Sequence, residues 1–472
     1  LVGARDALRA VARDPAAALR RGWRDERAWM AAVILVSAAA RLVLCLVNRE
    51  SNDDHTVVAH MIRSGGWLPP ASSACMECSH AKLFHYVLAA AFEWIVPTGD
   101  ASRMLGNLLN FAAGTALLVL CAVYLRRLPI SSTVRLLALA FVSFNPAVVG
   151  IFSQTTNDGF VILFSSLAIF AIARVLDGGR LRDGLGATLW AILAAASKAS
   201  GWVTFAAGTA VLVIASLAAG ARRRRYAAAA AVFVAGFLLV VPLLHPYRQN
   251  LAQAGTPFVN DAFYTPFMAA EVPRPPRWPL DMFLTFRLAE LLRVPYDDYQ
   301  GGPYPLHRES LWSQLYGRTV FLRFDQGIWR NLDPRLLDLG RVSLVLGLLP
   351  LAALLLGCAG ALAGAARGLS RRGLPALAER TDWQHLVYVG ALLASLVALL
   401  IRYHRLEWLF TWMKAIYLFP ALLSLLALFA LGLQRLWRRW PRLVALWMAL
   451  VVLVSIVDLT WLIHDLAWPS PG

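Results

Sequence analysis

The sequence predicts an all-α protein that crosses a lipid bilayer about eleven times. The chain has 472 residues, of which 59% are hydrophobic and only 15% are charged, a balance too apolar for a soluble protein of this length. Apolar runs of about 17 to 25 residues recur along it, the length that a helix needs to cross a hydrocarbon core of roughly 30 Å. These runs do not alternate between polar and apolar residues as barrel strands do, so helices are the expected spanning elements.

The predicted spans follow one another with polar turns between them. Residues 1–28 mix both charge signs ahead of the first apolar run, and no small-residue cleavage site follows that run. We therefore expect a cytoplasmic N-terminal segment and a retained first span rather than a signal peptide. The spans are expected at residues 29–47, 105–125, 136–152, 160–174, 184–198, 201–218, 226–244, 342–363, 385–401, 408–431 and 443–462.

The formal net charge of +17 comes largely from short arginine clusters between the apolar runs. Excess Lys and Arg mark cytoplasmic loops, and with the N-terminus in the cytoplasm this order of spans places the clusters inside and the C-terminus outside. We therefore expect a multi-pass inner (plasma) membrane protein. No cluster has the length or the interleaved aromatic residues of a nucleic-acid surface, so nucleic acid is not an expected partner. The clusters are Arg20–Arg21, Arg126–Arg127, Arg222–Arg225, Arg371–Arg372 and Arg435–Arg439.

One apolar run, Leu83–Val96, is not predicted to span. It is short and contains His85 and Glu93, and counting it as a span would move most of the arginine clusters to the outer side. A juxtamembrane helix in the outer interface is the expected structure, with a true span as the alternative.

Two long polar segments remain on the outer side. The first outer loop, 48–104, belongs to a transmembrane module that we expect to extend over 29–244. Residues 245–341 are rich in proline and contain Trp278, Trp312 and Trp329, which favours an ordered extracytoplasmic loop domain over a flexible linker. Residues 342–472 are expected to form the C-terminal transmembrane helices.

Two acidic motifs follow spans on the outer side. Asp53 and Asp54, with His55 directly after them, come within a few residues of the first span. Adjacent carboxylates can hold a divalent cation or act as a general base, although Asp is also a common helix N-cap. Asp158 lies in an Asn-Asp-Gly sequence that is equally typical of a turn. Their common side of the membrane favours a shared catalytic role where a phosphate-bearing lipid would present its head group.

A third motif leads into the juxtamembrane helix. Cys75 and Cys78 have the spacing of a tight disulfide, while the two thiols with a histidine could also supply part of a zinc site, or remain unpaired. Lys82 could bind a phosphate oxygen as a point charge. The remaining candidates for binding the acceptor or a metal are His55, Glu77, His80 and His85, and a divalent metal cation is the one candidate cofactor.

Further cations lie near the outer ends of later spans. Arg402 and Arg405 follow one apolar run, and Lys414 lies a short way inside the next. A lysine in an apolar helix is costly unless it reaches the interface or meets an anion, so Lys414 is a candidate for phosphate binding with snorkelling as the alternative. Lys198, at an outer junction between two spans, has the same two explanations.

These motifs resemble those of the membrane glycosyltransferases with the C-type (GT-C) fold, in particular the bacterial branch with the lipid A aminoarabinose transferases and the relatives of the protein O-mannosyltransferases. In that family an acidic pair and a Gly-x-Trp-like segment follow the first span, and a His-Pro-Pro-Leu-Tyr-like stretch enters a juxtamembrane helix. A further acid follows a Pro-containing span, and an Arg-Tyr-Leu-x-Pro-Ala-like pattern comes late. The matching segments here are Asp53-Asp54, Gly65-Gly66-Trp67, His80–Tyr86, Pro146 with Asp158, and Lys414–Ala421.

The chain departs from that pattern in two places. The Pro-Pro pair is absent, and Lys414 stands where the family has arginine. The resemblance is therefore stronger in the first half of the chain than in the second.

The resemblance implies that a sugar passes from a polyprenyl-phosphate carrier to a glycan, lipid or protein acceptor on the extracytoplasmic side, in the cell envelope. Asp53 or Asp54 would be the base, and Asp158 would orient the acceptor or join a metal site. Lys82, Arg402, Arg405 and Lys414 would bind the donor phosphate. The Ala-, Arg- and Leu-rich composition is typical of a GC-rich bacterial source.

A multi-pass transporter of a lipid-linked or small polar solute is the main alternative. Transporters usually place ionisable residues near the bilayer midplane, often on repeated halves, whereas the acids here cluster at one interface and no internal repeat is evident. A glycan polymerase or ligase of another fold, and a noncatalytic scaffold, are further alternatives.

Overall fold

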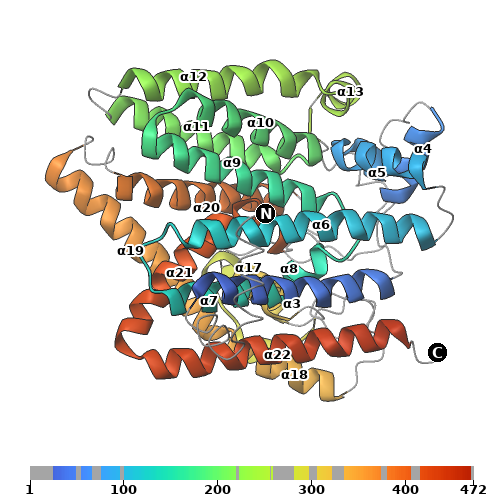
Figure 1. Ribbon diagram of the computed structural model, residues 1–472, viewed down its shortest axis with the longest axis vertical. Coiled ribbons are helices and arrows are strands. Elements are labelled where there is room, and N and C mark those ends of the chain that lie inside the picture. The colour runs from blue at the N-terminus through green and yellow to red at the C-terminus, as the bar shows by residue number, and fades with distance from the viewer. Residues whose placement is uncertain are drawn as a thin grey trace, which may run out of the picture.

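The computed structural model describes residues 25–48, 55–65, 76–95, 100–218, 223–255, 257–258, 281–296, 306–321, 334–373, 380–405 and 415–468. All regular elements in these ranges are helices (Figure 1). The predicted all-α polytopic fold class is confirmed.

Eight segments of the described part are long and apolar enough to cross a membrane. They are α3 (Glu26–Val47), α6 (Asp100–Leu125), α9 (Asp158–Gly178), α11 (Gly201–Ala218), α12 (Arg223–Val240), α18 (Pro334–Leu346) with α19 (Leu348–Arg372), η8 (Ala415–Ala421) with α21 (Leu422–Arg439), and α22 (Pro441–Ala467). The other predicted spans fall on α7 (Ser132–Phe144) with α8 (Pro146–Ile151), α10 (Leu181–Ser197) and α20 (Arg380–Arg405). Each predicted span therefore corresponds to a helix or a helix pair. In the resulting bundle α3, α6, α9, α12 and α22 run roughly along a common direction, and α19 crosses them obliquely (Figure 1).

The predicted span 136–152 is interrupted in the structure. Helix α7 ends at Phe144 and α8 begins at Pro146. Proline disfavours helical backbone at the residue before it, and Asn145 accordingly adopts ψ 125°. The Asn145 Oδ1 atom accepts a hydrogen bond from the Val148 amide at 3.2 Å, so Asn145 caps the new helix.

Helix α9 lies at the centre of the bundle. In the most apolar 18-residue stretch of α9, 78% is buried inside the protein. The corresponding share is 28% in α3 and in α22, which lie at the periphery. Helix α9 packs against α10, where fully buried alanines such as Ala187, Ala191 and Ala194 let the two backbones approach closely. The residue at the start of α9 is therefore held inside the bundle.

The two ends of the bundle differ in chemistry. The ends of α11, α19 and α21 and the starts of α12, α20 and α22 lie at one end of the bundle, and Arg223–Arg225, Arg371–Arg372 and Arg435–Arg439 are at these helix ends (Figure 1). Helices α4 (His55–Arg63), α5 (Leu83–Trp94) and α13 (His245–Ala254) lie at the opposite end, where α13 is seen end-on (Figure 1). Helix α5 has 12 residues and a length of about 18 Å, too short to span, as expected for a juxtamembrane helix.

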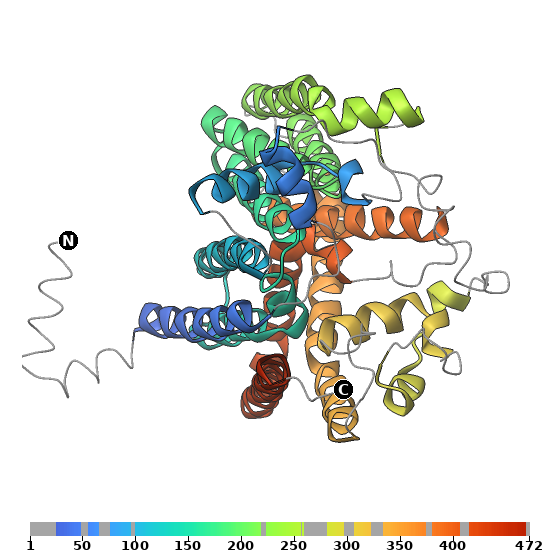
Figure 2. The same cartoon turned by 90° about the vertical axis from the view of Figure 1, so that its right-hand side faces the viewer.

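The described part of the predicted loop domain is also helical. After α13 it contains α15 (Asp281–Leu284), α16 (Leu288–Arg293), η4 (Leu306–Glu309) and α17 (Leu311–Val320). Figure 2 shows these elements on one side of the bundle, where α17 packs against α8 and η8. The Asn145 side chain donates to the Thr319 carbonyl at 3.0 Å, so the break in the membrane helix also anchors this segment.

Candidate functional site

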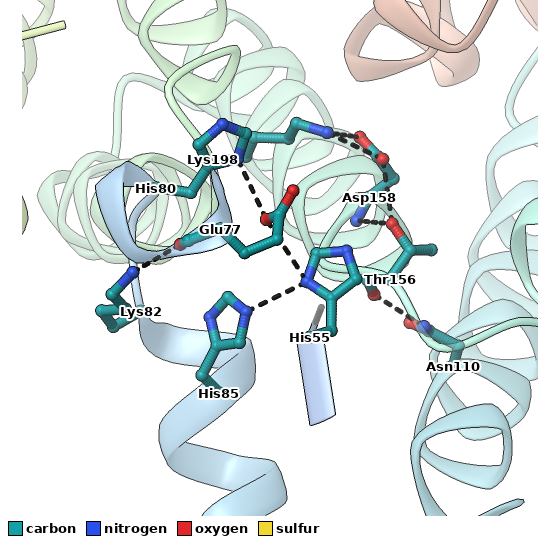
Figure 3. Close-up of polar contacts among 9 residues, drawn as sticks. All are labelled: His55, Glu77, His80, Lys82, His85, Asn110, Thr156, Asp158 and Lys198. Atoms are coloured by element: carbon teal, nitrogen blue, oxygen red, sulfur yellow. Dashed lines mark hydrogen bonds and ion pairs between the residues drawn. The ribbon is translucent and has the colours of Figure 1, made fainter. Parts of the chain in front are cut away.

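A buried ion pair joins the start of α9 to the end of α10. Lys198 Nζ lies 2.7 Å and 2.8 Å from the two carboxylate oxygens of Asp158 (Figure 3). The side chains of Lys198 and Asp158 are only 14% and 12% exposed. Two opposite charges buried side by side compensate each other, so the pair can be held inside the bundle.

A hydrogen-bonded turn fixes Asp158 in this position. Asn110 Nδ2 in α6 donates to the carbonyls of Gln154 and Thr156, each at 2.7 Å. The Thr156 hydroxyl donates to Asp158 Oδ2 at 3.0 Å, and the carboxylate sits in the first turn of α9, where the helix dipole favours negative charge. A Cβ at Gly159 would overlap the Asn110 Oδ1 atom, so this close approach needs glycine.

A second close turn places Lys198. The backbone at Lys198 leaves helical geometry and its amide donates to the Ala194 carbonyl at 3.1 Å. Three residues later, a Cβ at Gly201 would overlap the Ala194 backbone. The turn from α10 to α11 thus directs the lysine back towards α9.

Glu77 lies beside this pair and faces three histidines. Its carboxylate Oε2 is 3.4 Å from His55 Nδ1 and 3.3 Å from His80 Nδ1. His55 Nδ1 is also 3.0 Å from His85 Nε2. Figure 3 shows Glu77 between the Asp158–Lys198 pair and the imidazoles of His55 and His85. The first outer segment and the Asp158 turn, far apart in sequence, therefore build one polar cluster.

The charges in this cluster favour an ionised Glu77. Burial alone would raise the pKa of its carboxyl, but the neighbouring imidazoles of His55 and His80, in their protonated forms, and the Lys198 ammonium lower it well below its usual value. Burial also lowers the pKa of His85 well below that of a free histidine. Both directions favour a carboxylate beside a neutral imidazole, and both groups can act as ligands and hydrogen-bond acceptors.

Lys82 belongs to the same cluster but is turned away from the Asp158–Lys198 pair. It is 2% exposed, and its Nζ donates to the Glu77 carbonyl at 2.6 Å (Figure 3). Burial lowers the pKa of Lys82 to about 7, against the opposing effect of the Glu77 charge. Phosphate binding by Lys82 stays a prediction, and its present contact stabilises η1 (Met76–Ser79).

Several predicted site residues lie outside the described part of the chain: Asp53, Asp54, Cys75 and Lys414. Arg402 and Arg405 occupy the last turns of α20, and the structure does not describe their side chains. Cys78 is disulfide-bonded, so its sulfur is not a thiolate ligand for a metal.

The structure brings together Asp158, His55, Glu77, His80 and His85 from the predicted set, and adds Lys198. From the sequence, Lys198 could equally bind an anion or snorkel to the interface. The sequence signal for a site residue is its position at a predicted outer junction between two spans, on the same predicted side as Asp158. Its partner could not be assigned from sequence, because the ion pair joins residues 40 positions apart.

The arrangement suits chemistry on an anionic substrate. A carboxylate near a fixed ammonium can orient a hydroxyl, and the imidazoles and Glu77 supply proton acceptors or metal ligands within the same buried cluster.

No protein-family model matches the sequence, and no curated protein matches it. Among solved structures, the chain is similar to the oligosaccharyltransferase AglB from Archaeoglobus fulgidus, with a TM-score of 0.50 and 12% identity over 93% of this chain and 56% of that chain. The chain thus spans little more than half the length of AglB. That structure contains an inhibitory peptide and a dolichol-phosphate.

Two further structures match with lower scores. One is ArnT from Cupriavidus metallidurans bound to undecaprenyl phosphate, with a TM-score of 0.35 and 14% identity over 87% of this chain and 78% of that chain. The other is the arabinosyltransferase EmbB from Mycobacterium smegmatis, with a TM-score of 0.37 and 16% identity over 92% of this chain and 40% of that chain. AglB, ArnT and EmbB are all GT-C glycosyltransferases. The likeness to AglB shows that this chain has the GT-C fold of the membrane glycosyltransferases.

Proposed function

We propose that the chain is a glycosyltransferase that moves a sugar from a polyprenyl-phosphate carrier to an acceptor on the extracytoplasmic side of the membrane. One observation carries this proposal: the Asp158–Lys198 pair and the Glu77–histidine cluster lie together at the end of the bundle opposite the arginine-rich turns. The GT-C fold and the dolichol-phosphate in the AglB structure support a lipid-linked donor.

The proposed reaction is a single displacement at the anomeric carbon. The acceptor oxygen forms a bond to that carbon, the bond from the carbon to the carrier phosphate breaks, and the polyprenyl phosphate leaves with the electron pair. The acceptor proton passes to a carboxylate, for which Asp53 or Asp54 is the proposed base. Asp158 orients the acceptor.

Cationic groups stabilise the departing phosphate in this proposal. Lys198 is the described residue that we propose for this role, because it lies in the polar cluster and its side chain is 14% exposed; the phosphate would share it with Asp158. Lys82, Arg402, Arg405 and Lys414 remain proposed phosphate contacts. Residues 245–341 would cover the site and select the acceptor, as long outer loops commonly do.

The test uses purified full-length protein with a panel of radiolabelled undecaprenyl-phosphate pentoses and hexoses. The wild type is expected to release or transfer sugar, and Asp158→Asn is expected to lower the rate by at least about 100-fold. Asp183→Asn is the matched control, because Asp183 is also 8% exposed and ion-paired, to Arg174 at 2.9 Å, near the opposite end of α9.

The alternative outcomes separate the candidate functions. Equal loss in Asp158→Asn and Asp183→Asn would indicate damage to the fold rather than to the site. Uptake of the labelled lipid into sealed vesicles with no sugar released would support a transporter and overturn the proposal.

A further inference from the structure

Three metal-ligating side chains meet at the outer end of the bundle from three separate elements. His55 begins α4, Glu77 lies in η1, and His85 lies in the first turn of α5. One ligand atom from each falls within 4.8 Å of the other two (Figure 3). His55, Glu77 and His85 are all buried, at 1%, 8% and 0% exposure.

The spacing matches the ligand shell of a small cation. Zinc bound at about 2.0 to 2.1 Å in tetrahedral geometry holds its ligand atoms about 3.4 Å apart. The His55 Nδ1 to Glu77 Oε2 distance is 3.4 Å, and the His55 Nδ1 to His85 Nε2 distance is 3.0 Å. The third pair, Glu77 and His85, has its ligand atoms within 4.8 Å, so the His85 imidazole or the Glu77 carboxylate would move inward to place all three atoms around one ion.

The surroundings partly offset the charge that such an ion would add. Lys198 is a nearby cation, but Asp158 already neutralises it at 2.7 Å. Glu77 contributes a negative charge, and His80 Nδ1 lies 3.3 Å from the same carboxylate oxygen, where it can fix the carboxylate orientation. Lys82 contacts the Glu77 backbone, not its carboxylate.

We infer that His55, Glu77 and His85 form a binding site for one borderline divalent metal ion, with zinc as the best fit. Two imidazoles with one carboxylate favour zinc over magnesium or calcium, which prefer oxygen ligands. Three protein ligands leave a fourth position for water or a substrate oxygen. The ion would tie α4, η1 and α5 together. Because His55 directly follows Asp53-Asp54 in the sequence, the ion would also restrain the proposed base.

The competing explanation is a hydrogen bond between His55 and His85 with Glu77 as its counter-ion. The two explanations predict different metal contents, so the experiment measures binding and not transfer. Full-length protein is stripped with a chelator and titrated with Zn²⁺ alone, and separately with Co²⁺ alone. The readouts are bound metal per chain by mass spectrometry, visible Co²⁺ absorption and thermal unfolding.

We expect one Zn²⁺ per chain, visible absorption of four-coordinate Co²⁺, and a Zn²⁺-dependent rise in the unfolding midpoint. His85→Gln and Glu77→Gln should each weaken Zn²⁺ binding by at least about 100-fold. His60→Gln is the control, because His60 lies in α4 with His55 but its Nε2 atom is 3.1 Å from Ser102 Oγ. This variant should bind Zn²⁺ as the wild type does.

Wild-type protein that remains folded and takes up no Zn²⁺ or Co²⁺ would overturn the inference, whatever the variants do. Uptake that His85→Gln leaves unchanged would overturn it as well. These results do not depend on sugar transfer, so a failure of the proposed function would leave this test intact.

Discussion

At the scale of single residues, the Asp158–Lys198 pair has a clear energetic consequence. Both side chains are largely buried, so removing one partner leaves the other charge without compensation. We expect Lys198→Gln to destabilise the protein by about 3 kcal/mol. The double variant Asp158→Asn with Lys198→Gln should recover a large part of that loss, because it removes both charges. Thermal unfolding in detergent, combined as a double-mutant cycle, measures the coupling. Equal midpoints for the wild type and Lys198→Gln would contradict this prediction.

Gly159 offers a test of how tightly the Asp158 turn is built. A Cβ at this position would overlap Asn110 Oδ1, so Gly159→Ala should displace Asn110 and weaken its bonds to Gln154 and Thr156. We expect a loss of about 1 to 3 kcal/mol in stability and a lower transfer rate. Gly186→Ala is the comparison, because nothing lies within 4 Å of its added Cβ and alanine favours helix. If both substitutions behave alike, the turn is not under this steric constraint.

The candidate site shows what sequence can and cannot supply at this scale. The residue types of His55, Glu77, His85 and Asp158 marked them as polar side chains near the outer ends of apolar runs. Their mutual contacts were not predictable, because a helix boundary uncertain by a few residues turns a side chain to another face of the helix. Lys198 was assigned no partner for the same reason.

At the scale of elements, the apolar runs predicted the helices well because a membrane demands long uninterrupted segments with satisfied backbone groups. Proline is tolerated in membrane helices when neighbours satisfy the freed backbone groups, so Pro146 alone does not decide between a kink and a new helix. The contact of Asn145 with Thr319 could not be predicted either, because Thr319 lies in a distant segment.

The dual role of Asn145 leads to a prediction about α17. Asn145→Ala removes the cap on Val148 and the bond to the Thr319 carbonyl. We expect a loss of about 1 to 2 kcal/mol, and faster hydrogen exchange at the backbone amides of residues 311–320. Ser131→Ala is the control, since Ser131 stands at the N-cap of α7 without a side-chain capping bond. Unchanged exchange in α17 would show that packing alone holds this segment.

At the scale of the whole molecule, two sequence patterns agree with the arrangement of the bundle. Within the described residues, Arg126–Arg127, Arg223–Arg225, Arg371–Arg372 and Arg435–Arg439 lie at helix ends on one end of the bundle, and α4 and α5 lie at the other (Figure 1). This agreement arises because the excluded run, Leu83–Val96, is a short helix and not a span. Counting it would have reversed the side of every later turn.

The arrangement predicts which end faces the cytoplasm. Excess Lys and Arg keep loops on the cytoplasmic side, so the end that carries α4 should face outward.

Ser64 follows α4 and Ser370 lies near the end of α19, and both are exposed. Their hydroxyls donate to the backbone of the preceding turn, to Met61 at 2.9 Å and to Arg367 at 3.2 Å. Each serine can be replaced by cysteine with little structural change, in a background where Cys45, Cys121 and Cys358 are alanine. In intact spheroplasts, a membrane-impermeant maleimide should label Ser64→Cys, and should label Ser370→Cys only after permeabilisation. The reverse pattern would place the Asp158 cluster on the cytoplasmic side, where the extracytoplasmic transfer proposed for this chain cannot take place.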